Sequence, residues 1–120
     1  MDRKALIREY KENRRPTGVY CVRNTVNGKL LVGKSTDLPS ILNRQRAQLR
    51  SGLHPNPILQ KDLAEYGADT FVVEILDTLE VPEQADYDSS ADLRTLEQMW
   101  LDKLLPFGDR GYNPTPKHAA

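Results

Sequence analysis

A tight-turn signal between two apolar segments limits the possible folds of this chain more than any other feature of its sequence. Residues 17–23 (TGVYCVR) and 29–35 (KLLVGKS) are rich in β-branched, aliphatic and aromatic side chains. The pair Asn27-Gly28 between them readily adopts the positive backbone angles of a tight turn. The sequence therefore predicts an antiparallel β-hairpin, against which the remaining elements have to pack.

Helix signals surround this hairpin. Residues 2–13 predict a short, highly charged helix. Asp37 is a typical N-cap for a helix that runs to Ser51, and Asn56 is a typical N-cap for one that ends at Gly67. In both of these helices a proline falls in the first turn, where its missing N–H costs little. Two helices are therefore expected directly after the hairpin.

The second half of the chain adds one strand and one helix. Residues 70–76 (TFVVEIL) predict a third strand, and residues 77–90 predict an acidic loop. Ser89 and Asp92 have the spacing of a capping box and open a last predicted helix, from Asp92 to Leu105. The order α-β-β-α-α-β-α predicts an α/β (α+β) fold with a small three-stranded mixed sheet, whose first two strands are antiparallel, flanked by helices.

Length and composition exclude several classes of protein. The 120 residues suffice for one domain. No apolar run approaches the roughly 20 residues that span a bilayer, and the charged amino terminus lacks the apolar stretch of a signal peptide. Cys21 is the only cysteine, which excludes a disulfide framework within the chain. We therefore expect a cytoplasmic protein without a membrane partner.

Charge is unevenly distributed along the chain, although the net charge is zero. Residues 1–54 contain twelve Lys/Arg and four Asp/Glu, whereas residues 55–120 contain five and thirteen, which gives balances of +8 and −8. Such asymmetry is a hint of nucleic-acid contact through the basic half. The alternative is that the two halves pack together and neutralise one another, and charge alone does not decide between the two.

One carboxylate of the last predicted helix is out of place. At about 100° per residue, Glu97 lies in the middle of an apolar stripe. The stripe consists of Leu93, Leu96, Trp100 and Leu104. A carboxylate that faces a core is costly unless it is paired or binds a metal. Glu97 is therefore a candidate metal ligand, and the alternative is that it lies at the edge of the sheet and reaches water or an arginine.

Several short motifs, in order along the chain, resemble the GIY-YIG nuclease family. The two signature strands correspond to Gly18-Val19-Tyr20 and Leu31-Val32-Gly33, and Glu97 corresponds to the metal-binding glutamate. Further matches are Leu49, Gly52, His54, Asn56, Leu59-Gln60, Tyr66-Gly67, Phe71, Trp100 and Gly111-Tyr112-Asn113. The resemblance covers a GIY-YIG-like domain, residues 17–114, between an N-terminal helical extension, 1–16, and a C-terminal tail, 115–120.

The resemblance implies a nuclease that hydrolyses DNA phosphodiester bonds with one divalent metal ion, Mg²⁺ or Mn²⁺. Tyr20 then helps to deprotonate the attacking water, and Glu97 holds the metal, which neutralises charge that develops on the phosphate. An arginine on the first helix after the hairpin stabilises the phosphate. DNA is the partner that the family implies. Tyr20 and Glu97 should share one concave site, with Asn113 folded toward it.

Three positions depart from the family pattern. Leu31 replaces the second tyrosine, Ile41 stands at the position of the arginine, and Gln45 stands where a histidine is common. Arg44, one helical turn after Ile41, is a candidate catalytic replacement for the arginine, and the alternative is an exposed helix-face charge. His54 is a candidate contact for the phosphate or the leaving group, although a loop histidine before a proline is as often a turn residue.

Basic and polar residues are the candidate nucleic-acid contacts. They are Lys34, Ser35, Arg46, Arg50 and Asn113. Two hypotheses of different class follow. The first is a metal-dependent nuclease in which another residue replaces the phosphate-binding arginine, called here the phosphate clamp. The second is a catalytically inactive domain of the same fold that binds nucleic acid or protein. Tyr20, Glu97 and Asn113 favour the nuclease, whereas Leu31 and Ile41 favour the inactive domain.

Overall fold

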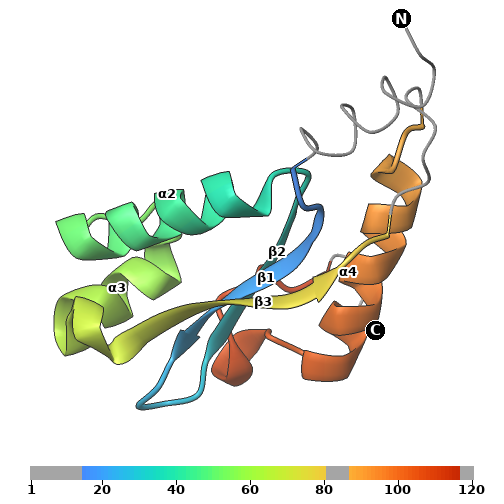
Figure 1. Ribbon diagram of the computed structural model, residues 1–120. Helices are drawn as coiled ribbons and strands as arrows, with labels where there is room; N and C mark the ends of the chain where they lie inside the picture. Colours follow the sequence, from blue (N-terminus) through green and yellow to red (C-terminus); the bar gives the residue numbers. More distant parts are fainter. Residues whose placement is uncertain (1–14, 81–86, 117–120) are drawn as a thin grey trace, which may run out of the picture.

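The computed structural model describes residues 15–80 and 87–116 of the 120-residue chain (Figure 1). The helix predicted for residues 2–13 and part of the predicted acidic loop lie outside these ranges. The strands are β1 (Gly18–Asn24), β2 (Leu30–Ser35) and β3 (Phe71–Thr78). The helices are α2 (Leu38–Ser51), α3 (Pro57–Tyr66) and α4 (Ser90–Leu104), with short 3₁₀ turns η1 (Ala68–Thr70) and η2 (Gly108–Arg110). None of the described helices is long and apolar enough to cross a membrane.

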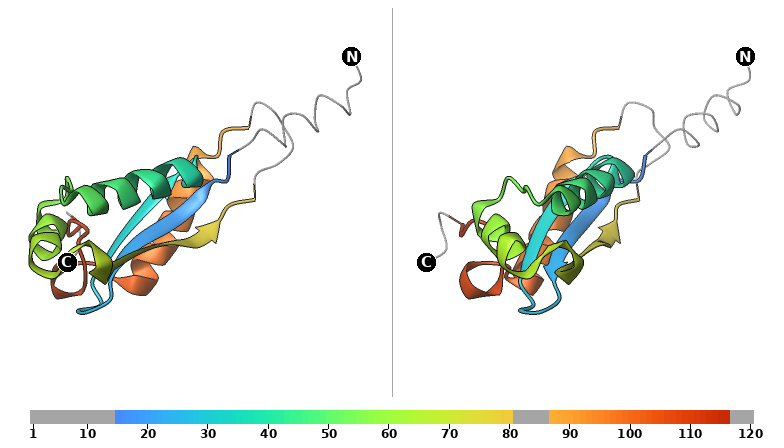
Figure 2. Two further views of the ribbon diagram at one scale, coloured as in Figure 1. Left: turned by 60° about the vertical axis from the view of Figure 1, so that its left-hand side comes forward. Right: turned by 90° about the vertical axis from the view of Figure 1, so that its left-hand side faces the viewer.

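The sheet separates two apolar layers, and side chains of β1 point alternately into each of them. Tyr20 and Val22 join the side chains of α2 and α3, whereas Val19 and Cys21 join those of α4. Helices α2 and α3 thus cover one face of the sheet and α4 covers the other (Figure 1 and Figure 2). The fold is therefore α+β, with β1 contributing to both cores.

All three strands pair antiparallel, so the predicted mixed sheet is wrong. The strand order is β2-β1-β3, and β1 is antiparallel to both neighbours. Strands β2 and β3 run in the same direction, so a parallel pair would have formed only if β3 lay beside β2. Instead, α2 and α3 return the chain to the hairpin end of the sheet, where Phe71 of β3 pairs with Asn24 of β1. The antiparallel hairpin itself is confirmed, with Gly28 at a φ of 75° in its turn.

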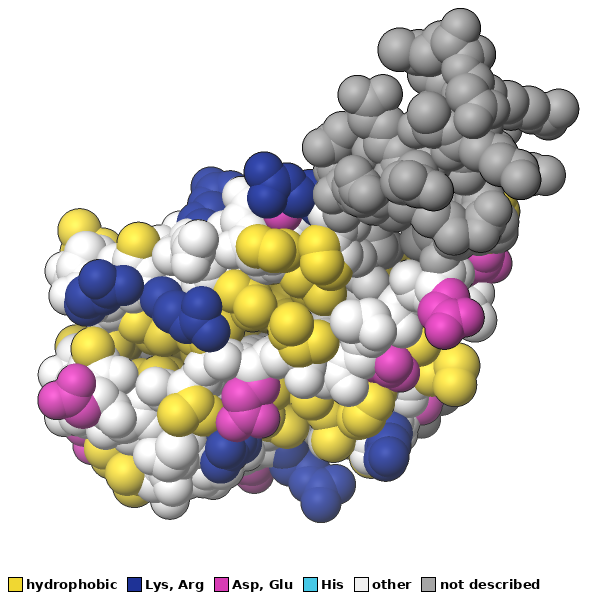
Figure 3. Space-filling model, viewed as in Figure 1, with side chains coloured by type: hydrophobic (Ala, Val, Ile, Leu, Met, Phe, Trp, Pro, Cys, Tyr) yellow, Lys and Arg dark blue, Asp and Glu magenta, His cyan; other side chains and the backbone are white. Residues whose placement is uncertain are grey.

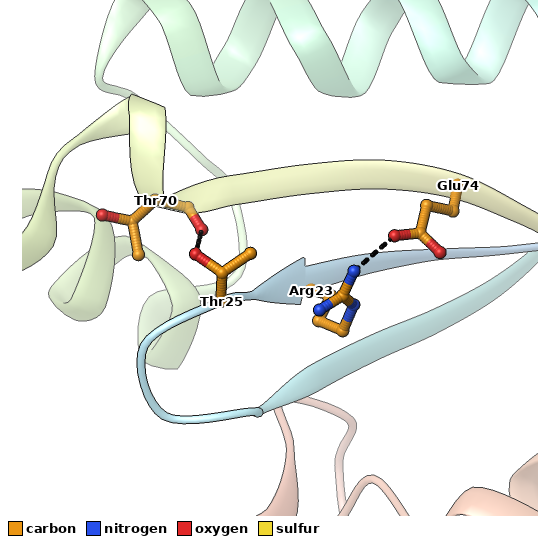
Figure 4. A network of polar contacts seen from close by, with 4 residues as sticks. All are labelled: Arg23, Thr25, Thr70 and Glu74. Carbon is orange, nitrogen blue, oxygen red and sulfur yellow. Dashed lines mark hydrogen bonds and ion pairs between the residues drawn. The ribbon is translucent and has the colours of Figure 1, made fainter.

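Side-chain contacts fasten β3 to β1 near the hairpin end (Figure 4). Nη2 of Arg23 lies 2.7 Å from Oε1 of Glu74. The Thr25 hydroxyl donates to the carbonyl oxygen of Thr70 at 2.6 Å. Both contacts join residues far apart in the sequence, and they hold the start of β3 against the end of β1.

The two predicted helix caps after the hairpin are confirmed. The Asp37 side chain accepts a hydrogen bond from Ser40 N. The Asn56 side chain accepts from the backbone N–H groups of Ile58 and Leu59. Each of the two helices also ends, as predicted, at a glycine with a positive φ. Local sequence signals thus account for the boundaries of α2 and α3.

The predicted capping box of the last helix is wrong. Ser89 occupies the N-cap position of α4, but its φ of −86° and ψ of 2° lie outside the extended region typical of N-caps, and its side chain makes no cap hydrogen bond. Asp88 takes over this role, because its Oδ1 accepts from Ser90 N at 3.0 Å. The helix consequently begins at Ser90 rather than at Asp92.

Residues 111–113 cover the outer edge of β2. An isolated parallel bridge joins this segment to Leu30, and Tyr112 N donates to Leu30 O at 2.8 Å. The Asn113 side chain continues the pattern, since it accepts from Val32 N at 2.8 Å and donates to Val32 O at 2.9 Å. The edge strand of the hairpin is therefore stabilised by a segment about eighty residues further along the chain.

Candidate active site

Tyr20 lies on the central strand, and its ring extends over the edge strand β2. It pairs directly with Gly33. A Cβ atom at Gly33 would lie 2.6 Å from the Tyr20 hydroxyl oxygen, so only glycine leaves room for the ring. The register between β1 and β3 shifts at Val19/Tyr20, and a bulge at such a place re-aims the side chain beside it. The Tyr20 side chain is buried, with the residue 7% exposed.

Three side chains from two helices act on the Tyr20 hydroxyl. Burial raises the pKa of Tyr20 most strongly, a hydrogen bond with Gln45 opposes this rise, the negative charge of Glu97 adds to it, and the positive charge of Arg44 lowers it. The phenol is therefore protonated at neutral pH. Arg44 belongs to α2 and Glu97 to α4, which cover opposite faces of the sheet. The Tyr20 ring lies over Gly33 of the edge strand, whose next residue, Lys34, is the ion-pair partner of Glu97.

A chain of hydrogen bonds runs from the turn before α3 to Gln45 of α2. Asn56 N donates to Nδ1 of His54 at 3.1 Å, so the ring proton lies on Nε2. Nε2 then donates to Oε1 of Gln45 at 2.8 Å. Gln45 in turn lowers the pKa of the Tyr20 phenol, against the effect of burial. Gln45, in the sequence a departure from the family pattern, thus acts on both His54 and Tyr20.

His54 has a structural position in this chain of hydrogen bonds. Burial lowers the pKa of His54 and keeps the ring neutral at pH 7. Both ring nitrogens already have partners, and the side chain is buried. No ring nitrogen is left for the contact with phosphate or a leaving group that the sequence predicts, so His54 acts as a strut between α2 and α3.

Glu97 lies on the sheet-facing side of α4, with a cation beside it. Leu93 is buried, and Leu96 and Trp100 pack against the sheet, so the predicted stripe is confirmed. The Glu97 side chain is 21% exposed, and its Oε1 lies 3.5 Å from Nζ of Lys34 on β2. The sequence analysis left open whether Glu97 binds a metal or reaches water or an arginine. In the structure it pairs with a cation, which is a lysine and not an arginine, and it stays partly accessible to solvent.

The three departures from the family pattern lie at the core cluster that contains Tyr20 or act on Tyr20 itself. Leu31 and Ile41 are half-buried and pack against this cluster, while Gln45 lowers the pKa of Tyr20. None of the three side chains carries a positive charge, and the cation whose charge lowers the pKa of Tyr20 is Arg44.

The candidate nucleic-acid contacts fall into two groups rather than one face. Arg46 and Arg50 line a groove of about 400 Å³ between α2 and β3, together with Asp69 and with apolar side chains that include Phe71 and Val72. Figure 3 shows basic side chains along α2 beside a hollow with hydrophobic side chains in its floor. Lys34 and Ser35 lie elsewhere, in a hollow between the end of β2 and the start of α4 with a volume of about 480 Å³.

The Asn113 side chain is held along β2. Its amide oxygen and amide nitrogen both bond to the backbone of Val32, so Asn113 holds the strand next to Gly33. These bonds do not test whether Asn113 folds toward a site shared by Tyr20 and Glu97 or whether it contacts nucleic acid, and both stay predictions.

A buried carboxylate that the sequence analysis missed holds the tail in place. Oδ2 of Asp62 accepts from the Tyr112 hydroxyl at 2.7 Å and from Nδ2 of Asn27 at 3.0 Å. Burial, together with the bond to Asp62, raises the pKa of Tyr112 to about 12. Helical periodicity could have identified Asp62, because it lies on the buried face of α3. Glu97 was identified in the same way, from its place in the apolar stripe of α4.

Comparison with solved structures places this fold among known ones. No family model matches the sequence, and no curated protein matches it. The catalytic domain of the homing endonuclease I-TevI is similar, with a TM-score of 0.62 and 28% sequence identity over 83% of this chain and 99% of that chain. A glutamate-to-alanine mutant of the same catalytic domain matches with a TM-score of 0.62 and 24% identity over 82% and 92%. Because I-TevI is a GIY-YIG homing endonuclease, the resemblance of this chain to the GIY-YIG nucleases is confirmed.

Proposed function

We propose that this chain is a GIY-YIG-type nuclease domain that hydrolyses DNA phosphodiester bonds with one divalent metal ion, Mg²⁺ or Mn²⁺. The observation that carries the proposal is that the buried Tyr20 ring lies over Gly33, next to Lys34, whose ammonium is 3.5 Å from Glu97, in a fold like that of a homing endonuclease catalytic domain. A carboxylate, a guanidinium and a phenol are groups that hydrolysis of a phosphodiester can use together at one place.

Tyr20 and Arg44 have distinct tasks in this proposal. Because the pKa of Tyr20 is raised, its phenol is protonated at neutral pH, and it takes the proton of an attacking water only while it passes its own proton to a solvent water. Tyr20 then acts as a proton relay, oriented by Gln45. Arg44 is exposed, and its planar guanidinium matches the geometry of a phosphate. In this proposal Arg44 therefore binds the phosphate in place of the family's arginine, whose position is occupied here by Ile41.

The residues of the site fit one divalent cation. Glu97 offers a hard carboxylate oxygen, and its side chain is 21% exposed, so a hydrated ion can reach it once the ammonium of Lys34 moves away. Within residues 15–80 and 87–116, no group of three or more His, Cys, Asp or Glu side chains could hold a metal. Mg²⁺ commonly binds through one or two carboxylates, with waters and substrate phosphates as its other ligands. When bound, the ion would neutralise charge that develops on the phosphate.

Removal of divalent metal tests the proposed reaction. We expect the full chain to cut plasmid DNA, single-stranded DNA or both in the presence of Mg²⁺ or Mn²⁺, and to cut neither in EDTA. Gel electrophoresis of supercoiled, nicked and linear plasmid and of labelled single strands measures the outcome. Cleavage that persists in EDTA would contradict the metal dependence, and the absence of cleavage with either cation would favour the inactive domain.

The groove between α2 and β3 supports DNA as the partner. Arg46 and Arg50 are exposed and lie one helical turn apart, and Phe71 and Val72 form part of the floor between α2 and the strand. Phosphates contact guanidinium groups in most protein–DNA interfaces, and apolar surface suits sugars and bases. The groove is therefore proposed as part of the path of the DNA.

DNA affinity should fall with added salt, and less steeply when the groove loses its arginines. Each phosphate contact releases counterions, so the slope of log affinity against log salt should decrease by about 0.9 for each contact that Arg46→Gln and Arg50→Gln remove. Fluorescence anisotropy of a labelled duplex without divalent ions measures the slope, and Arg110→Gln, an exposed arginine of η2, is the matched control. An unchanged slope would remove the groove from the DNA path.

A binding-only domain is the second candidate, because the departures from the family pattern fall together at the site. Leu31 and Ile41 pack against the core cluster that contains Tyr20, at positions where the family has polar groups, and Lys34 is paired with Glu97. An inactive domain that binds nucleic acid or protein accounts for these features. The ion pair with Lys34 would account for Glu97 in that case as well. We favour the nuclease because the fold resembles that of a homing endonuclease catalytic domain and because Tyr20 and Glu97 stand at positions of the family pattern.

A further inference from the structure

We infer that Lys34 is a positioning residue that exchanges Glu97 for a DNA phosphate, so that a divalent cation and DNA bind to this site cooperatively. The inference rests on the proposed function and adds a regulation of the same site. Without DNA, the ammonium of Lys34 holds the carboxylate. With DNA, a phosphate takes the ammonium and leaves the carboxylate to the cation.

The contact between the two residues joins elements on different sides of the site. Lys34 follows Gly33 in the edge strand β2, whereas Glu97 lies on α4. Nζ of Lys34 lies 3.5 Å from Oε1 of Glu97, and the two side chains are 41% and 21% exposed. The ammonium is therefore beside the carboxylate oxygen proposed to bind the metal, and the lysine is the more exposed of the pair.

The strength of this ion pair suits an exchange. Solvent screens a pair that is this exposed, and the long lysine side chain loses conformational freedom in it, so the pair is weak and easily broken. A divalent cation on Glu97 would nevertheless be repelled by an ammonium that stayed in place, because like charges at short range repel. Lys34 therefore opposes the metal until another anion draws it away.

A place for that anion lies beside the pair. The hollow between the end of β2 and the start of α4 is lined by the cations Lys34 and Arg94, by the hydroxyl-bearing Ser35, Thr36 and Ser90, and by Leu93. Cations and hydroxyl groups are typical contacts of a DNA phosphate. The flexible four-carbon stem of a lysine allows its ammonium to turn either toward Glu97 or toward this hollow. Binding of a phosphate in the hollow and release of Glu97 are then the same movement.

Binding of Mn²⁺ to the full chain tests the exchange without relying on cleavage. Electron paramagnetic resonance reports the free Mn²⁺, with and without a short DNA duplex whose integrity is checked on a gel. Binding to the duplex alone, and to Glu97→Gln protein with the duplex, is subtracted. We expect the duplex to raise the Mn²⁺ affinity of the wild type by about 5- to 150-fold, the usual range for coupled sites.

The variants should separate Lys34 from other lysines. Lys34→Met should bind Mn²⁺ more tightly than the wild type when DNA is absent, and the duplex should then add little. Lys61→Met, which removes an exposed lysine of α3, should behave as the wild type. Lys34→Gln, with a polar end group, provides a second variant, and circular dichroism checks that both remain folded.

Two results would overturn the inference in distinguishable ways. Lys34→Met protein that binds Mn²⁺ no more tightly than the wild type, while Glu97→Gln loses binding, would refute the exchange and leave the metal site standing. Glu97→Gln protein that binds Mn²⁺ like the wild type would refute the role of Glu97, and with it the proposed function as well.

Discussion

Replacing Glu97 by glutamine should abolish metal-dependent DNA cleavage while the domain stays folded. The amide keeps the shape of the carboxylate but removes the charge that a hard cation requires. A bound metal supplies several kcal/mol of transition-state stabilisation, so we expect the cleavage rate to fall by about 10³-fold or more. The side chain is only partly buried and has one lysine partner, so unfolding free energy should change by about 0–1 kcal/mol.

Two measurements and one control check this result. Cleavage rates on plasmid with Mn²⁺ report the reaction, and thermal unfolding followed by circular dichroism reports stability. Glu74→Gln is the matched control, because it makes the same change in an exposed carboxylate that is also ion-paired, to Arg23, on β3. If Glu97→Gln protein cuts DNA as fast as this control, Glu97 has no part in the reaction and the nuclease hypothesis loses its main support.

Ile41→Arg should raise the cleavage rate by about 10²–10³-fold, because it restores a positive charge where the family pattern has its arginine. Removal of one hydrogen-bond donor that stabilises the transition state commonly lowers the reaction rate by about 10²–10³-fold, and restoring such a group should raise the rate by a similar factor. Ile41 is half-buried at the margin of the core, one helical turn before Gln45, so the methylenes of an arginine can keep its packing while the guanidinium reaches the site.

The ratio kcat/KM on a labelled DNA substrate measures this gain. Ile58→Arg is the matched control, since it adds the same charge at an isoleucine of α3 that is 47% exposed. If the wild type does not cut, and if neither Ile41→Arg nor its combination with Leu31→Tyr yields metal-dependent cutting, more than a clamp is missing. The binding-only domain would then replace the enzyme as the better account of this chain.

The sequence predicted those parts of the fold in which a residue determines the backbone conformation of its immediate neighbours. Asn27-Gly28 predicts the turn of the hairpin, and Asp37 and Asn56 predict the starts of two helices, because a turn or a cap depends on residues within one or two positions. The neighbour of β3 could not be predicted in this way. It depends on which edge of the hairpin is free, and Asn113 closes one of them from the other end of the chain.

The candidate site shows the same division. Helical periodicity alone singles out Glu97, and the same argument applied to α3 would have found Asp62. The partners of the candidate residues could not be predicted, because each partner comes from a distant segment of the chain. Lys34 is the partner of Glu97, and Gln45 acts on both Tyr20 and His54. A motif assigns a residue type to a position, but only packing decides whether a histidine is free to meet a phosphate or is buried between two helices.

The late position of residues 111–113 in the chain sets the order in which this domain can be completed on the ribosome. The hairpin can form as soon as its own residues have emerged, within microseconds. The bond between Val32 and Asn113 spans 81 residues, which take roughly 4–16 s to synthesise at about 5–20 residues per second. During that interval the outer edge of β2, which carries Gly33 and Lys34, lacks this partner and exposes backbone that can pair with another chain. The edge strand that carries Gly33 and Lys34 is thus open to pairing with another chain until residues 111–113 have been synthesised.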